Sequence, residues 1–201
     1  MSILVIAEHD NQKLKGSTLN TVAAASKLAG EVSILIAGSG IDAVVSESQT
    51  LNEISKIVTC DNNVYENFIA EDLSSLVVAI SDGYTHILAP STTFGKNLMP
   101  RVAALLDTSQ VSDIVNVISE DTFLRPIYAG NAFATVKSND KKKCVTIRPT
   151  SFDPAPSTGG SAEIVKSDPG DKFESSKFVK REEIKSDRPV SYTHLTLPTR
   201  S

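Results

Sequence analysis

Thr85 to Leu106 reads Thr-His-Ile-Leu-Ala-Pro-Ser-Thr-Thr-Phe-Gly-Lys-Asn-Leu-Met-Pro-Arg-Val-Ala-Ala-Leu-Leu, and this stretch decides the fold. Its first part, His86 to Ala89, is a short apolar run with no polar face, which is typical of a parallel strand covered on both sides. The leucines and the valine from Leu98 to Leu106 then recur at helical spacing. The stretch therefore predicts a buried strand, a polar turn and an amphipathic helix.

Two interpretations of the polar turn are open. In the first, Thr92, Thr93, Gly95 and Lys96 form a candidate cofactor pocket that holds a small anion at the helix N-terminus. In the second, Thr93 or Asn97 caps the helix, Gly95 lets the chain bend and Lys96 is solvated. The turn lacks the spacing of a phosphate loop or a dinucleotide fingerprint, which favours the second interpretation.

The first forty residues predict a β-α-β unit. Ile3 to Ala7 reads as a buried strand, and Glu8 to Ser17 as a polar loop at its carboxyl end. Leu19 to Leu28 carries apolar residues among alanines and predicts a helix that packs closely on a sheet. Val32 to Ala37 is the second strand.

The next segments continue the alternation of strands and helices. Gly38 to Gly40 forms a turn, which is phosphate-friendly in composition but follows the second strand and fits a tight strand-to-helix connection. A weaker helix at Ala43 to Leu51, a strand at Lys56 to Cys60 and a long amphipathic helix at Ile69 to Ile80 follow.

The pattern changes after Ile114. Short strands predict antiparallel additions to the sheet near the C-terminal end, at 114–118, 122–128, 133–136 and 144–147. Lys141 to Lys143 is interpreted as a solvated turn. Ser151 to Pro169 reads as an extended linker that wraps or leaves the domain. Phe173, Phe178 with Val179, and Ile184 suggest a final strand or docking segment.

Together these elements predict an α/β fold of three α/β/α layers, Rossmann-like, with a mostly parallel sheet and helices on both faces. Ligands of such sheets sit at the carboxyl ends of the strands, where the strand order reverses. We therefore expect the loop Glu8 to Ser17 to face the turn Ser91 to Asn97. A nucleotide would bind there if the chain binds one.

Composition and charge disfavour several classes of partner and site. The chain has 201 residues, a net charge of −4 and a sequence pI near 5.4, and these values disfavour nucleic acid and acidic membranes as partners. Cys60 and Cys144 sit beside apolar runs, and we expect buried, reduced thiols rather than a disulfide or a metal site. The apolar start, Ile3 to Ala7, is too short for a membrane span. Taken literally, the chain is cytoplasmic.

Several motifs occur together in a recognisable order. They are Leu-Val-Ile-Ala-Glu-His at 4–9, Phe-Gly-Lys-Asn-Leu-Met-Pro-Arg-Val-Ala-Ala at 94–104, Val-Ser-Asp-Ile at 111–114, Ile-Tyr-Ala-Gly-Asn-Ala at 127–132, Arg-Pro-Thr-Ser-Phe-Asp at 148–153 and Lys-Ser-Asp-Arg-Pro at 185–189. From about Ile3 to Pro189 the chain resembles the electron transfer flavoprotein alpha subunit, and the motif order is highly specific.

The resemblance implies an electron carrier rather than an enzyme. In this family an alpha and a beta subunit share one FAD, take electrons from acyl-CoA and related dehydrogenases, and pass them to a membrane-bound quinone oxidoreductase. The resemblance also implies that the N-terminal alpha domain packs on the beta subunit. FAD is held mainly by a separate C-terminal alpha domain. A bacterial member is cytoplasmic, and a eukaryotic one that has lost its leader is mitochondrial.

The end of the chain departs from the family pattern. After Pro189 the family continues with a glycine- and arginine-rich turn that grips FAD, but no glycine follows Gly170 here. We expect an N-terminal domain at 1–153, a linker and docking segment at 154–189 and a non-native tail at 190–201, with the FAD-binding domain absent. We therefore expect this fragment alone to hold no FAD.

No catalytic or metal-binding residue is expected. His9 and His86 are interpreted as packed or hydrogen-bonded side chains, because no Ser, Cys or carboxylate is spaced for a triad with either. His194 lies in the tail and carries no functional weight. No Cys/His spacing predicts a metal site.

Two further interpretations compete with the electron-carrier domain. The first is an autonomous nucleotide-binding domain of the stress-protein or adenine-nucleotide hydrolase type, which would need a glycine-rich phosphate turn after a strand. The nearest features are Gly38 to Gly40 and Thr92 to Lys96. The second is a module that only binds the dehydrogenases, for which an exposed apolar patch would be the signature.

Overall fold

The computed structural model describes residues 1–174, 176–180 and 182, and its sheet is built outward from β1 (Ser2–Ile6). β1 pairs in parallel with β2 (Glu31–Gly38) on one side and with β4 (His86–Pro90) on the other. Ile3 and Val5 face one hydrophobic core, and Leu4 and Ile6 face the other. Because both faces of β1 are buried, its sequence is continuously apolar.

The main sheet has seven strands in the order β10-β3-β2-β1-β4-β9-β5, and its pairings among the described residues are parallel. The other strands are β3 (Lys56–Asp61), β5 (Gln110–Ile114), β9 (Lys143–Ile147) and β10 (Glu163–Lys166). The chain first runs from β1 through β2 to β3 and then returns to β4 on the other side of β1. The strand order therefore reverses between β1 and β4, which is where such sheets place a ligand crevice.

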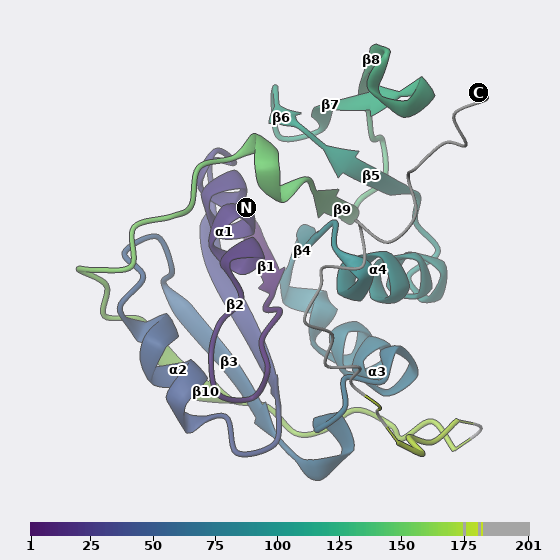
Figure 1. Cartoon of the computed structure of the whole chain (residues 1–201). Helices are drawn as coiled ribbons and strands as arrows, with labels where there is room; N and C mark the ends of the chain where they lie inside the picture. Colours follow the sequence, from purple (N-terminus) through teal and green to yellow (C-terminus); the bar gives the residue numbers. More distant parts are fainter. Residues whose placement is uncertain (175, 181, 183–201) are drawn as a thin grey trace, which may run out of the picture.

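Helices cover both faces of this sheet, as predicted (Figure 1). One core packs β1 and β2 against α1 (Gly16–Ser26) and α2 (Asp42–Gln49). The second core packs the opposite face against α3 (Ala70–Ile80) and α4 (Thr93–Leu105). The expected three-layer α/β/α fold is confirmed. Short 3-10 turns η1 to η4 lie at Asn63–Tyr65, Ser81–Gly83, Tyr128–Gly130 and Pro149–Ser151.

The antiparallel strands form a small sheet of their own, in the order β6-β7-β8, which lies against β5 (Figure 1). These strands are β6 (Asn116–Val117), β7 (Thr122–Ile127) and β8 (Ala132–Lys137). The single strand expected at 114–118 is divided, because β5 ends at Ile114 after a bulge and β6 begins at Asn116.

The strand at 144–147 was expected among the antiparallel additions, and this expectation is wrong. As β9 it runs parallel between β4 and β5. Lys143 pairs with His86, so the chain re-enters the sheet at the amino end of β4, where Lys142 donates to the Ser81 carbonyl oxygen at 2.8 Å. Lys142 is thus a structural contact rather than only part of a solvated turn. From there Cys144, Val145 and Ile147 fill both cores, which an antiparallel hairpin on the surface would not do.

The segment expected as a linker wraps the domain, and part of it is a strand. Residues 154–174, here called the strap, include β10, which pairs with the edge strand β3. β10 is largely exposed and is held by backbone pairing. Such a strand needs no buried apolar residues, and its sequence therefore did not predict it. A Cβ built at Gly160 would lie 2.2 Å from the Leu51 carbonyl oxygen, which shows how closely the strap approaches α2. Ile184 and the tail 190–201 lie outside the described residues.

Candidate functional site

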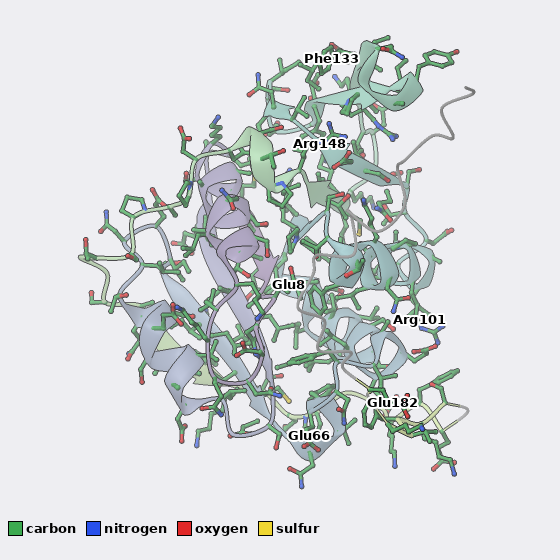
Figure 2. All side chains as sticks on the ribbon, in the orientation of Figure 1. Glu8, Glu66, Arg101, Phe133, Arg148 and Glu182 are labelled. Carbon is green, nitrogen blue, oxygen red and sulfur yellow. The ribbon has the colours of Figure 1, made fainter. Side chains whose placement is uncertain are left out.

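The loop after β1 meets the start of α4 at the point where the strand order reverses. The Thr92 hydroxyl donates to Glu8 Oε2 at 2.9 Å, which confirms that the two loops face each other. Figure 2 shows Glu8 between the ribbons of α1 and α4. The crevice predicted from the alternation of strands and helices is therefore present.

Glu8 is the side chain that joins the two sides of this crevice. Its Oε2 atom also accepts a hydrogen bond from Ser17 Oγ, in the first turn of α1, at 2.7 Å. The backbone N–H and carbonyl oxygen of Glu8 both bond to the Thr18 hydroxyl at 2.9 Å. Thr92 is the N-cap residue of α4. One carboxylate therefore joins the N-terminal ends of α1 and α4.

A cavity of about 620 Å³ opens beside Glu8. Three carboxylates and one cation line it, and the cation, Lys15, is paired with Asp10 at 2.9 Å. The rings of Phe68 and Phe94 also line the cavity, with their centroids 6.5 Å apart. The charge left in the cavity is therefore negative, because Glu8 and Glu66 remain beside the Asp10–Lys15 pair.

The four residues of the sequence-predicted pocket do not share one cavity. Thr92 contacts Glu8, and Thr93 lines the cavity. Gly95 is buried, and a Cβ built there would lie 1.9 Å from the Pro90 carbonyl oxygen. Lys96 is exposed and helps to lower the pKa of Asp113. Of the four predicted residues, Thr92 and Thr93 therefore lie at the crevice, and Gly95 and Lys96 do not line its cavity.

The Gly38 to Gly40 turn uses its backbone donors within the protein. Asn11 Oδ1 accepts from the Ser39 N–H at 3.2 Å, and Asp61 Oδ1 accepts from the Gly40 N–H at 2.8 Å. A Cβ at Gly38 would lie 2.2 Å from Asn11 Oδ1, so glycine allows this approach. The turn is a tight strand-to-helix connection, the second of its two interpretations.

His9 and His86 are both packed in the interior, as expected. His9 Nδ1 accepts from the Asn11 N–H at 3.1 Å, and its ring meets Phe68 edge to face at a centroid distance of 5.0 Å. Burial lowers the pKa of His9 to about 4. His86 Nε2 lies 2.6 Å from the Glu120 carbonyl oxygen, and burial lowers its pKa as well. Both imidazoles are therefore neutral structural groups at pH 7.

A second polar cluster, missed by the sequence reasoning, lies at the carboxyl ends of β5 and β9. Arg148 Nε donates to Asp113 Oδ2 at 3.0 Å, and a second guanidinium nitrogen donates to the same oxygen. Asp113 has a left-handed φ of 59° at the β5 bulge, and its N–H donates to the Thr146 hydroxyl at 2.8 Å. Burial raises the pKa of Asp113, but the hydrogen bonds and the positive charge of Arg148 outweigh this and leave it lowered.

Both cysteines are free, buried thiols, as predicted. Burial raises the pKa of Cys144 to about 12 and also raises that of Cys60. Within the described ranges, no three His, Cys, Asp or Glu side chains are grouped to hold a metal ion. No helix in this part of the chain has the length and apolar character needed to cross a membrane.

The residues at the crevice do not fit a flavin or nucleotide pyrophosphate. Such a group needs free amide or cationic donors. Here Glu8 accepts from the Ser17 and Thr92 hydroxyls at the two helix starts, and Asp61 accepts from the Gly40 N–H. The cavity beside them carries excess negative charge, which repels phosphate.

Comparison with known proteins identifies the family. A family model described as "Electron transfer flavoprotein domain" matches residues 3–172. The chain is 48% identical over 190 residues to a Pseudomonas aeruginosa protein named "Electron transfer flavoprotein subunit alpha", which covers 94% of this chain and 61% of that protein. The chain belongs to the electron transfer flavoprotein alpha-subunit family.

Other alpha-subunit relatives agree. A mitochondrial electron transfer flavoprotein subunit alpha from Dictyostelium discoideum is 48% identical over 170 residues, covering 81% of this chain and 48% of that protein. The Paracoccus denitrificans subunit alpha is 40% identical over 193 residues, covering 94% and 61%. The chain therefore spans between about half and three fifths of these relatives' lengths.

The motifs that resemble the electron transfer flavoprotein alpha subunit have identifiable structural places. The motif at 94–104 forms most of α4, and the motif at 127–132 forms the turn between β7 and β8. The motifs at 111–114 and 148–153 supply Asp113 and Arg148, which pair across two strands. The resemblance thus rests on residues that build the α4 side of the crevice, the small sheet and the ion pair.

Proposed function

We propose that this chain is the N-terminal domain of an electron transfer flavoprotein alpha subunit and acts as a non-catalytic scaffold that binds the beta subunit. FAD is then held by parts of the full-length alpha subunit beyond this chain, and the fragment alone holds none. The observation that carries the proposal is the match to alpha subunits along 94% of the chain. The crevice supports it, since the Ser17 and Thr92 hydroxyls donate to Glu8 instead of being free for a phosphate.

The complete complex would carry electrons from acyl-CoA and related dehydrogenases to a quinone oxidoreductase. The names of the relatives support the electron-carrier role, because they are electron transfer flavoprotein subunits. The cytoplasm of a bacterium, or the mitochondrial matrix of a eukaryote, is the compartment that fits this role. The alternative of an autonomous nucleotide-binding domain is not favoured.

The small sheet offers the surface that we assign to beta-subunit binding. Three large apolar side chains are exposed on or next to it: Tyr128 (80%), Phe133 (61%) and Ile118 (53%). Figure 2 shows Phe133 at the outer end of the molecule, on this sheet. Tyr128, Ala129 and Gly130 have left-handed φ values of 49°, 56° and 91°.

Strained turns of this kind are retained where a side chain must be presented in a fixed position. Aromatic residues also provide much of the binding energy at protein interfaces. The exposed aromatic pair on a strained turn therefore fits a protein-binding surface.

Gel filtration of the chain mixed with the beta subunit tests the proposal. We expect the wild type to co-elute with the beta subunit, and Tyr128→Ser combined with Phe133→Ser to weaken the complex at least tenfold, or about 1.4 kcal/mol. Leu105→Ser is the matched control, because Leu105 is 53% exposed on α4, a helix that Figure 1 shows apart from the small sheet. No co-elution of the wild type at micromolar concentrations would contradict beta-subunit binding. Equal weakening by the control would contradict the assigned surface.

A further inference from the structure

The crevice between α1 and α4 has the form of an anion site. α1 and α4 follow β1 and β4, the two strands between which the strand order reverses, and their N-terminal ends meet there. In sheets of this type a ligand phosphate takes hydrogen bonds from the first turn of such a helix. Two hydroxyl donors, Ser17 Oγ and Thr92 Oγ1, converge at this point.

A carboxylate of the protein already occupies this point. Both hydroxyls donate to the same atom, Glu8 Oε2, at 2.7 and 2.9 Å. The Glu8 backbone is fixed at the same helix by the buried Thr18 hydroxyl. A carboxylate oxygen that accepts hydrogen bonds at two helix N-termini makes the same kind of interaction as a phosphate oxygen.

Carboxylates also accept hydrogen bonds from neighbouring backbone N–H groups at this edge of the sheet. Glu47 Oε2 accepts from the Leu14 N–H at 3.0 Å, and Asp61 Oδ1 accepts from the Gly40 N–H at 2.8 Å. Glu47 and Asp61 thus bind backbone donors of the loops after β1 and β2, and Glu8 binds the hydroxyls at the starts of α1 and α4. An arriving phosphate would have to displace a negative group and would meet the others nearby.

We infer that Glu8 is a specificity-determining residue that replaces a ligand phosphate with an internal carboxylate and so closes the crevice to phosphate-bearing ligands. It also joins the two halves of the sheet by linking α1 to α4. This inference holds whether or not the chain binds a beta subunit. It assigns the exclusion of phosphate-bearing ligands from this crevice to one side chain.

The test is an anion-specific rescue of Glu8→Ala in the full 201-residue chain. Removing the carboxylate leaves both hydroxyls and both helix N-termini facing an empty anion site. We expect Glu8→Ala to melt roughly 5 °C below the wild type in chloride buffer. Inorganic phosphate at matched ionic strength should then restore part of this loss. By calorimetric titration, Glu8→Ala should bind phosphate at least tenfold more tightly than the wild type.

Two further variants separate this role from a general effect of charge. Glu66→Ala removes a carboxylate that lines the same cavity but makes neither of these hydroxyl contacts, and we expect its response to phosphate to match that of the wild type. Glu8→Gln keeps a carbonyl acceptor and fills the same space, so we expect a smaller loss of melting temperature and no rescue by phosphate.

Phosphate binding by the wild type as tight as by Glu8→Ala would overturn the inference. So would the absence of any phosphate-specific response in Glu8→Ala, or an equal response in Glu66→Ala. If Glu8→Ala does not fold in chloride buffer, recovery of folded protein in phosphate supports the inference. Failure to recover it in phosphate contradicts the inference.

Discussion

His9 shows how the burial of one residue sets the pH dependence of stability. It is 5% exposed, and burial lowers its pKa from 6.5 to about 4. Because the unfolded chain takes up a proton below pH 6.5 and the folded chain does not until about pH 4, stability falls as the pH falls through this window. This lowering of the His9 pKa corresponds to about 3 kcal/mol of stability.

We therefore expect His9→Gln to lose less stability than the wild type between pH 7 and pH 4.5, because Gln does not titrate. Urea unfolding at several pH values in this range measures the difference. The relevant result is the slope of the free energy of unfolding against pH, since the substitution also changes packing and therefore shifts the stability at every pH. Parallel curves for the two proteins would show that His9 does not titrate differently in the folded and unfolded states.

Gly95 is a residue whose lack of a side chain is required by its surroundings. A Cβ at this position would lie 1.9 Å from the Pro90 carbonyl oxygen, a backbone atom that cannot rotate away. We expect Gly95→Ala to lower the free energy of unfolding by about 3 kcal/mol. Gly16→Ala is the control, because a Cβ there meets nothing within 4 Å and alanine favours the first turn of α1. Chemical denaturation compares the two, and equal stability of both variants would contradict the close packing at Gly95.

At the scale of elements, the strap is held to the domain by a few specific contacts. The Gly170 N–H donates to the buried Tyr65 hydroxyl at 2.9 Å, and the Phe173 N–H donates to Asp72 Oδ1 at 2.8 Å. The Arg101 guanidinium lies 4.7 Å from the centre of the Phe173 ring. These contacts join the strap to the face formed by α3 and α4.

Gly170→Ala should release this part of the strap, because a Cβ there would lie 2.6 Å from the Leu76 backbone nitrogen. We expect trypsin to cut after Lys166 or Lys172 several times faster than in the wild type, while the melting temperature changes by only a few degrees. Ser167→Ala is the control, since it keeps the backbone bond from residue 167 to the Thr59 carbonyl oxygen. Unchanged cleavage of Gly170→Ala would show that the strap tolerates the extra methyl group.

The elements also show how far the sequence predicts the structure. β1 and β4 were predicted because buried parallel strands are continuously apolar, and α3 because its apolar residues repeat at helical spacing. β10 was missed because backbone pairing at an exposed edge requires no apolar pattern. The direction of β9 was predicted wrongly, because short strands near turns look alike whether they pair in parallel or antiparallel.

The position of the site could be predicted from the sequence, but the side-chain contacts within it could not. Alternating strands and helices put the loops after β1 and β4 together, and this follows from topology alone. The bond between Glu8 and Thr92 joins residues 84 positions apart, and the Asp113–Arg148 pair joins residues 35 apart. Side-chain pairing over such separations depends on register and bulges, which a single sequence does not show.

At the scale of the whole molecule, the domain combines a crevice of the nucleotide-binding type with an internal carboxylate at its centre. The exposed aromatic residues lie on or next to the small sheet, which packs beside β5 at one edge of the main sheet. This is the surface that we assign to binding a partner. This arrangement fits a scaffold in an electron carrier better than a cofactor-binding unit. The central claim is therefore that this chain contributes binding surface and holds no flavin by itself.

The absorbance spectrum of the purified chain after incubation with FAD and gel filtration tests this claim most directly. We predict that the protein peak carries no flavin absorbance, because the Ser17 and Thr92 hydroxyls are bound to Glu8 and the Gly40 N–H is bound to Asp61. A flavin band in stoichiometric ratio to the protein would contradict the account, since it would mean that the crevice or another part of this chain binds FAD.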